Sequence, residues 1–333
     1  MSFDPDAPAA EGGLFGLPFT PEQSRIVVQA VPWQATTSFR RGTREGPEAM
    51  IEASLQVDLF DLEYGDFWRE GIALLPEDPR FRVWDAEAEP DALAVIESLG
   101  NAPGSAARVN VLSECVNDAV YQAASRALAA GHIPALIGGD HSTPFGAIRA
   151  VAEHFPDVGI LHIDAHADLR VAYEGFTWSH ASILYNVLRY ISDVSCVTQV
   201  GIRDVGSAEV ALIREEPRLH TYFDPDLAQR LASGEPWARI VDEIVESLPQ
   251  RVYITFDVDG MEPTLCPNTG TPVPGGLDWR QVQTLLRVLS ARRHIVGFDV
   301  NEIGDNAWDG NVAARLFYKL CGATIRSQPT AQK

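Results

Sequence analysis

The sequence has little lysine, few cysteines and no long hydrophobic run. Of its 333 residues only Lys319 and Lys333 are lysine, which we interpret as a composition effect without a functional meaning. Lysine and arginine together number 26 against 46 aspartate and glutamate residues, so the formal net charge is −20. Such a charge repels phosphate backbones and anionic lipid surfaces. The composition therefore argues against nucleic-acid binding and membrane binding.

Cysteine usage excludes two further classes of protein. The cysteines lie far apart and include no CxxC pair, which argues against a disulfide scaffold and a zinc–thiolate site. The N-terminus is acidic and does not resemble a signal peptide. No stretch of about 18 apolar residues predicts a membrane helix. We therefore expect a cytoplasmic protein with free thiols at Cys115, Cys196, Cys266 and Cys321.

Short apolar runs alternate with helical patterns along most of the chain. Residues 1–24 are rich in Pro, Gly and acidic residues and are expected to form an arm, whereas residues 25–333 are expected to form a single domain. Strands that alternate with helices predict a mostly parallel sheet covered on both faces. In such folds the functional site lies beyond the carboxyl ends of the strands. The apolar runs are 25–31, 133–137, 158–163, 194–202, 251–256 and 294–300, and the helical patterns are 46–57, 111–130 and 278–292.

Three of the strand candidates end in segments rich in histidine and aspartate. These segments are residues 137–142, 161–168 and 254–260. Two of them place Asp or His side chains two residues apart, and side chains alternate faces along an extended chain, so these neighbours are predicted to point the same way. The six candidate metal ligands are His141, Asp164, His166, Asp168, Asp257 and Asp259.

The charge of these side chains indicates two metal ions. Four aspartates in one place repel one another unless cations neutralise them, and two divalent ions balance four negative charges. Mixed carboxylate and imidazole ligands suit Mn²⁺, Fe²⁺, Co²⁺ or Ni²⁺ better than a metal that prefers thiolates. Two ions about 3.5–4 Å apart share a hydroxide and polarise a substrate. The pattern therefore predicts a dinuclear hydrolytic site.

On these motifs the sequence resembles the ureohydrolase family, which includes arginase, agmatinase and formimidoylglutamase. The resemblance spans about residues 25–325 and implies a three-layer α/β/α fold with an eight-stranded parallel sheet. It also implies two divalent ions, Mn²⁺ before Ni²⁺, in a homotrimer or homohexamer. The matching stretches are Gly-Gly-Asp-His-Ser (138–142), Asp-Ala-His-Ala-Asp (164–168), Ser-His-Ala-Ser (179–182), Asp-Val-Asp-Gly-Met-Glu-Pro (257–263), Gly-Thr-Pro-Val-Pro-Gly-Gly (270–276) and Asp-Val-Asn-Glu (299–302).

The resemblance assigns roles to the metal ligands, to His180 and to Glu302. A hydroxide that bridges the ions attacks the guanidino carbon, and urea and an amine are released. Asp168 orients this hydroxide, His180 delivers a proton to the leaving amine, and Glu302 binds the guanidinium. One ion is held by His141, Asp164, Asp168 and Asp257, and the other by Asp164, His166, Asp257 and Asp259, so that Asp164 and Asp257 bridge. His162 is expected to lie in the core or to support a ligand.

Departures from the family pattern leave the substrate open. Ala181 stands where the family usually has glycine. Glu262 stands at the third acidic position of the Asp-x-Asp-x-x-Asp-Pro pattern, and residues 304–311 differ from the agmatinase pattern. Arg170 would repel the ammonium end of agmatine unless Glu174 neutralises it, and it would bind a carboxylate in bidentate fashion. Trp178 is expected to wall the pocket.

The substrate ranking follows from this balance. We place agmatine or a similar guanidino amine first, ahead of guanidino acids, formiminoglutamate and free guanidine. A metal-binding pseudoenzyme that serves as a partner protein is one alternative of a different class. A single-zinc deacetylase of related fold is another.

Overall fold

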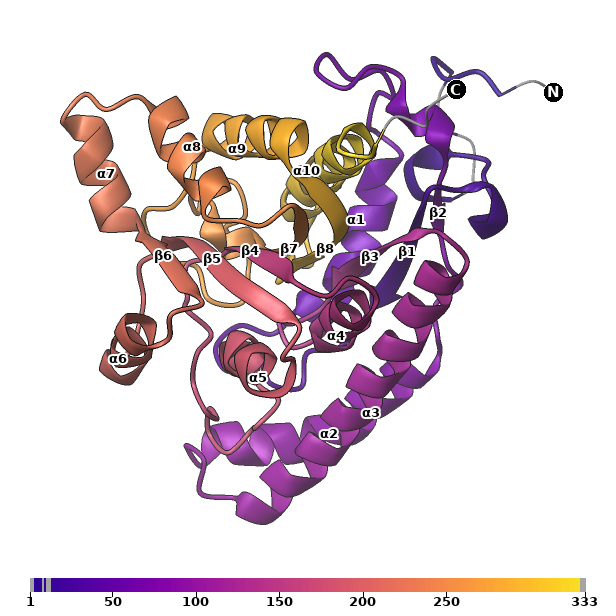
Figure 1. The fold of residues 1–333 in the computed structure, drawn as a ribbon. Helices are drawn as coiled ribbons and strands as arrows, with labels where there is room; N and C mark the ends of the chain where they lie inside the picture. The colour runs from indigo at the N-terminus through magenta and orange to yellow at the C-terminus, as the bar shows by residue number, and fades with distance from the viewer. Residues whose placement is uncertain (1–2, 8, 10–12, 330–333) are drawn as a thin grey trace.

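The computed structural model describes residues 3–7, 9 and 13–329, and its centre is one twisted sheet of parallel strands (Figure 1). The eight strands follow the order β2-β1-β3-β8-β7-β4-β5-β6, and every neighbouring pair is parallel. The strands are β1 (Ile26–Val31), β2 (Ile72–Leu74), β3 (Ile133–Gly138), β4 (Val158–Ile163), β5 (Val194–Ile202), β6 (Leu219–Phe223), β7 (Arg251–Asp257) and β8 (His294–Asn301).

Helices cover both faces of the sheet, so the fold has the three layers predicted from the sequence (Figure 1). One face carries α2 (Arg80–Glu97), α3 (Pro103–Ala129), α4 (Phe145–His154), α5 (Ile183–Tyr190) and α6 (Ser207–Glu215). The other carries α1 (Gly46–Ser54), α7 (Asp224–Ala232), α8 (Trp237–Glu246), α9 (Trp279–Arg292) and α10 (Ala307–Arg326). No helix in the described part of the chain is both long and apolar enough to cross a membrane.

Each face of the sheet has its own hydrophobic core. On β4, Leu161 and Ile163 belong to one buried cluster, whereas Val158 and Ile160 belong to the other. Successive side chains of a strand point to opposite faces, and a parallel sheet covered on both sides buries both sets. This double burial explains why the strands are continuous apolar runs in the sequence.

The predicted elements agree with the structure where the local pattern is strong. The runs 158–163 and 194–202 coincide with β4 and β5, and Asp278 caps α9 by accepting a hydrogen bond from Gln281 N–H. The predicted arm, residues 1–24, includes positions outside the described residues. Of its described part, Leu14, Phe15 and Leu17 are buried in the core. Residues 330–333 of the predicted domain also lie outside the described residues, and the domain boundary stays a prediction.

The strand order explains how distant motifs meet. Strands β3, β8, β7 and β4 are consecutive neighbours in the sheet. The carboxyl ends of these four strands therefore lie along one edge of the sheet. Residues far apart in the sequence meet there: His141 and Glu302, which are hydrogen-bonded, are separated by about 160 positions. The site is built on this edge, as expected for an open parallel sheet.

Candidate metal centre

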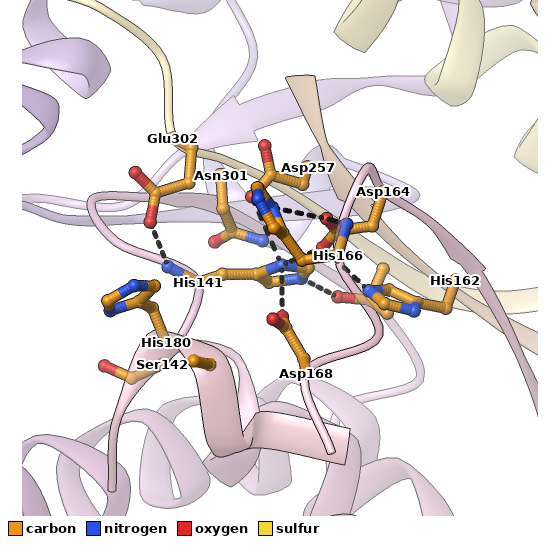
Figure 2. A network of polar contacts seen from close by, with 12 residues as sticks. His141, Ser142, His162, Asp164, His166, Asp168, His180, Asp257, Asn301 and Glu302 are labelled. Carbon is orange, nitrogen blue, oxygen red and sulfur yellow. Dashed lines mark hydrogen bonds and ion pairs between the residues drawn. The ribbon is translucent and has the colours of Figure 1, made fainter. Parts of the chain in front are cut away.

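His141, which follows β3, lies against three aspartates from two other strand ends (Figure 2). Its Nδ1 is 2.9 Å from Asp164 Oδ2, 3.2 Å from Asp168 Oδ2 and 3.4 Å from Asp257 Oδ2. All four side chains are buried. They are the four residues predicted to hold one ion.

A second group adjoins the first and shares one of its members. His166 Nδ1 is 3.1 Å from Asp259 Oδ2 and 3.5 Å from Asp164 Oδ1. Asp164 therefore presents Oδ2 to the first group and Oδ1 to the second. Asp257 Oδ1 accepts a hydrogen bond of 2.8 Å from Asp259 N–H, and its predicted share in the second group stays a prediction.

The spacing of these atoms fits two divalent ions. Ligand atoms that bind one ion at about 2.1 Å and at right angles to each other lie about 3.0 Å apart. The nitrogen-to-oxygen distances in the two groups, between 2.9 and 3.5 Å, are close to this value. Buried carboxylates that converge on the same histidines repel one another unless protons or cations neutralise them. The residues present would therefore hold a dinuclear site.

The backbone that presents these ligands differs from the one predicted. The two-residue spacing predicts that Asp164, His166 and Asp168 lie on an extended strand, but β4 ends at Ile163 and Asp168 has a left-handed φ of 56°. Likewise Asp259 lies in a short 3-10 helix, Val258–Gly260, beyond β7. The two loops cross closely, since a Cβ on Gly260 would lie 2.6 Å from Asp164 N. The convergence comes from loop turns, and the strand-periodicity argument was wrong.

Burial changes the acidity of the ligands. Burial, together with the charge of Asp164, raises the pKa of Asp168 to about 7. Burial and the neighbouring Asp259 and Asp164 raise the pKa of Asp257 well above its usual range. These carboxyl groups hold protons when no cation faces them, so cation binding displaces protons.

We predict that the affinity for divalent ions falls as the pH drops below about 7. Because the pKa of Asp168 is raised, its carboxyl stays protonated at acidic pH and must ionise before it binds an ion. For each displaced proton the apparent affinity weakens about tenfold per pH unit. Calorimetric titration of the stripped protein with Mn²⁺, in two buffers of different ionisation enthalpy, measures both the affinity and the proton release. An affinity that is constant with pH would contradict the prediction.

His141 is oriented by a hydrogen-bonded chain behind it. Thr255 Oγ1 donates to Asp299 Oδ1 at 2.8 Å and lies 2.8 Å from His141 Nε2. Since the one hydroxyl proton goes to Asp299, Thr255 Oγ1 accepts from His141 Nε2–H. The lone pair of His141 is then on Nδ1, the atom that faces the three aspartates, as a metal ligand requires.

His162 lies close enough to be mistaken for a ligand. Its Nε2 is 2.9 Å from Asp164 Oδ2, and both side chains are buried. The hydrogen bonds of Gln199 show which ring nitrogen of His162 is protonated. The side-chain NH₂ group of Gln199 donates to Ala167 O at 2.8 Å and to His162 Nδ1 at 3.1 Å. The side-chain oxygen of Gln199 accepts from Thr221 Oγ1. His162 therefore carries its proton on Nε2 and donates it to Asp164. This geometry agrees with the supporting role predicted from the sequence.

Glu302 follows β8 and has one free carboxylate oxygen. Its Oε1 accepts a hydrogen bond of 2.9 Å from His141 N–H, and its backbone has a left-handed φ of 62°. Its Oε2 is buried and has no hydrogen-bond partner among the described residues. Burial and the nearby Asp140 raise the pKa of Glu302 well above its usual range. A cationic hydrogen-bond donor at Oε2 would satisfy this oxygen.

A cavity of about 150 Å³ opens beside the His and Asp groups. The candidate residues His166, Asp168, Arg170 and His180 all line it. Gly270 lies over Glu302, since a Cβ there would be 2.6 Å from Glu302 Oε2. The remaining lining residues are Ser38, Tyr173, Ala181, Asp204, Glu209 and Thr271.

Arg170 has a different partner from the one considered in the sequence analysis. Its Nε lies 3.7 Å from Glu209 Oε2, and its guanidinium carbon is 5.0 Å from the ring centre of Tyr173. Glu209, at the start of α6, also accepts hydrogen bonds from Leu169 N–H and Gly206 N–H. The pairing with Glu174 is replaced by this contact. Glu209 was not among the residues predicted from the sequence, and its place in the first turn of α6 is known only from the structure.

Trp178 does not belong to the cavity lining. Its ring packs against Phe145 and Tyr190, with centroid distances of 4.9 and 5.7 Å, and its Nε1 donates to Glu114. Trp178 therefore packs its loop, residues 169–179, against α4 and α5. Tyr173 and Ala181 line the cavity in place of Trp178.

Comparison with known proteins identifies the family that has this architecture. A parallel eight-stranded sheet with a His and Asp cluster suited to two ions defines a class of metal-binding α/β/α proteins. The model of the Arginase family matches residues 24–323, and the chain belongs to this family.

Two curated relatives and one solved structure illustrate the match. The chain is 33% identical to the N(1)-aminopropylagmatine ureohydrolase of Thermus thermophilus, over 93% of this chain and 94% of that protein. It is 28% identical to the agmatinase of Bacillus anthracis, over 90% and 91% of the two chains. The crystal structure of the agmatine ureohydrolase of Thermoplasma volcanium superposes with a TM-score of 0.71 at 26% identity, and covers 93% of this chain and 92% of that one.

Proposed function

We propose that the protein is a hydrolase that cleaves a C–N bond of a guanidino compound and releases urea and an amine, as an agmatinase does. One observation carries this proposal: the two ligand groups joined by Asp164 lie next to Glu302, whose free buried oxygen suits a guanidinium. The membership of the arginase family supports it. So do the relatives that are named ureohydrolases and agmatinases.

The cofactor, the assembly and the compartment are parts of the same proposal. Mn²⁺ is the first candidate for both ions and Ni²⁺ the second, because carboxylate and imidazole ligands suit either. We assign the metal ligands to the six predicted residues. Bound ions would lower the pKa of a water molecule and polarise the guanidino group. A homotrimer or homohexamer is proposed on the family resemblance, and a cytoplasmic location on the widely spaced cysteines, which are free thiols.

The residues of the chain then divide the remaining tasks. Glu302 Oε2 accepts N–H groups of the guanidinium and fixes its carbon over the cluster. Asp168 orients the attacking water and takes a proton from it. The C–N bond breaks with its electron pair leaving on the amine nitrogen. His180 takes up the proton that Asp168 received and delivers it to that nitrogen, and the remaining hydroxyl proton passes to Asp168 as the C=O of urea forms. The products are urea and a neutral amine, and the leftover proton on Asp168 goes to the solvent.

The charge of the cavity favours a guanidino amine as substrate. Arg170 is the one arginine among the residues that line the cavity, and Glu209 lies against it. Asp204, exposed at the rim, adds a further negative charge. A cationic tail therefore meets a rim with an excess of carboxylates. The alternative, a guanidino acid, is favoured by the partial exposure of Arg170, since its guanidinium suits a carboxylate.

The direct test is a screen for urea and ammonia release. Purified protein loaded with Mn²⁺, and separately with Ni²⁺, is incubated with agmatine, aminopropylagmatine, guanidinobutyrate, formiminoglutamate and guanidine. We expect urea from the guanidino amines at the highest kcat/KM. Absence of urea and of ammonia from every compound, in protein that binds two ions, would refute the proposed function and favour a binding role.

Arg170→Ala distinguishes the two substrate classes. With agmatine we expect kcat/KM to stay the same or to rise, because a repulsive charge is removed. With guanidinobutyrate, which carries a carboxylate at the same end, we expect KM to rise about tenfold or more, corresponding to about 1.4 kcal/mol or more. Arg189→Ala, an exposed arginine on α5, is the matched control. A loss confined to agmatine would contradict this view of the cavity.

A further inference from the structure

Behind the cavity, Asp140 and Thr36 form a hydrogen-bonded pair that the proposed chemistry does not yet use. Asp140 Oδ2 accepts from Thr36 Oγ1 at 2.8 Å and from Thr36 N–H at 3.0 Å. Its Oδ1 accepts from the backbone and the hydroxyl of Ser142. Both Asp140 and Thr36 are fully buried. Four donors therefore hold this carboxylate in one orientation.

Thr36 connects this carboxylate to His180. The backbone N–H of His180 donates to Thr36 Oγ1 at 3.0 Å, and His180 Nδ1 lies 3.2 Å from the same oxygen. His180 itself lines the cavity and faces the side of Glu302 and Ser142 (Figure 2). Since Nδ1 and Nε2 lie on opposite sides of an imidazole ring, Nε2 is turned away from Thr36.

A count of protons fixes the tautomer of His180. The single hydroxyl proton of Thr36 is given to Asp140, so Thr36 Oγ1 has only lone pairs for Nδ1. A bare Nδ1 would place two lone pairs against each other at 3.2 Å. Ser179 Oγ accepts from Ala181 N–H, and its hydroxyl proton would reach Nδ1 only across the longer distance of 3.4 Å, so the closer Thr36 Oγ1 decides the tautomer. Nδ1 therefore carries the proton in neutral His180, and the lone pair is on Nε2.

We propose that Thr36 and Asp140 are positioning residues that hold His180 in the Nδ1–H tautomer, so that Nε2 faces the cavity with a free lone pair, takes up the proton released by the attacking water and delivers it to the leaving amine. This inference rests on the proposed function. Asp140 fixes the hydroxyl direction of Thr36, and Thr36 fixes the ring of His180. The carboxylate also stabilises the positive charge that appears on the imidazole when Nε2 takes up a proton.

Burial makes this arrangement effective near neutral pH. Burial lowers the pKa of His180, although Asp140 opposes the shift. His180 is therefore mostly neutral before the reaction, and its tautomer decides whether the nitrogen that faces the substrate has a free lone pair. With the opposite tautomer, Nε2 would carry a proton before the reaction and could not take one up.

The tautomer is measured directly, without turnover. Protein labelled with ¹⁵N-histidine is reconstituted with the diamagnetic ion Zn²⁺, and its His180 signals are identified by their absence in His180→Ala. In the parent protein, above the pKa of His180, we expect a protonated Nδ1 and an unprotonated Nε2. In Thr36→Val, which removes the hydroxyl at nearly constant volume, a substantial Nε2–H population is expected. Nε2–H in the parent, or an unchanged tautomer in Thr36→Val, would overturn the inference.

Kinetics test the same inference through coupling. On agmatine, Thr36→Val is expected to lower kcat by roughly 10- to 100-fold, with little change in KM, which is less than the roughly 10²- to 10⁴-fold of a complete proton-transfer contribution because the imidazole itself is kept. Thr36→Ser, which keeps the hydroxyl, should stay within about threefold of the parent. Thr198→Val, which deletes another buried threonine hydroxyl, on β5 and bonded to Ser247, controls for a general packing effect and should retain parental kcat.

The decisive comparison uses the His180→Ala background. If Thr36 acts through His180, adding Thr36→Val to His180→Ala causes no further loss. A full additional loss would show that Thr36 acts elsewhere and would overturn the inference. If the parent protein hydrolyses no guanidino compound, the proposed function fails, and the tautomer measurement still decides the arrangement of Thr36, Asp140 and His180.

Discussion

Asp164→Ala is expected to abolish turnover and to reduce the bound divalent ions below one per chain. Asp164 is the only residue whose two carboxylate oxygens reach both ligand groups among the described contacts, Oδ2 towards His141 and Oδ1 towards His166. Its removal weakens both sites together and leaves the two histidines facing fewer charges. Removing one residue from a group of catalytic residues that act together typically lowers kcat by about 10³-fold or more.

The measurement combines metal analysis with urea release. Parent protein and variants are dialysed against the same limiting concentration of Mn²⁺, and bound metal is counted by atomic emission. We expect two ions per chain in the parent and in Asp118→Ala, a control that removes an exposed aspartate on α3. His166→Ala should keep the first ion better than Asp164→Ala does, because His166 faces one group. Two bound ions and parental activity in Asp164→Ala would refute the shared-ligand arrangement.

The positions of the ligands were predictable from the sequence because they lie within short motifs at strand ends. A buried parallel strand is a continuous apolar run, so its end is visible, and β4 was predicted with its observed bounds. The geometry was less predictable. Asp168 reaches the cluster through a left-handed residue, which no local pattern of this segment indicates.

Contacts between distant segments could not be predicted in the same way. Glu174, four residues away, was one partner considered for Arg170, but the structure places Arg170 beside Glu209, which α6 brings from 39 positions further along. Thr36 and Asp140 are separated by 104 positions and meet because β1 and β3 are neighbours in the sheet. Neither contact leaves a periodic signal, since its cause is the strand order.

Three of the elements that were not predicted were missed for local reasons. Strand β2 has three residues, shorter than the usual run, and Pro90 lies inside α2, where proline ordinarily predicts a helix end. Helix α10 has 20 residues and is buried on most of its surface, so the polar stripe that marks a surface helix is weak. These elements shape the cores more than the site, and the fold class was predicted without them.

Glu302→Gln is the second substitution with a large expected effect, a fall in kcat/KM of roughly 30- to 1000-fold. Glutamine keeps the shape of the side chain and an oxygen that accepts the hydrogen bond from His141 N–H. At the position of Oε2, however, it presents an N–H group to a guanidinium that has only N–H groups to offer. The cation is then desolvated without a partner, which costs about 2–4 kcal/mol.

Because glutamine has nearly the same shape as glutamate, Glu302→Gln is expected to affect substrate binding and to leave metal binding unchanged. Metal analysis of Glu302→Gln should still give two ions per chain, because Glu302 touches the backbone of His141 and not its ring. Steady-state kinetics on agmatine then measures the loss, with Glu97→Gln, an exposed glutamate on α2, as the control. If another residue holds the guanidinium, kcat/KM in Glu302→Gln equals that of the control while both ions are bound. That result would remove Glu302 from the binding site and leave its buried Oε2 to be satisfied by water.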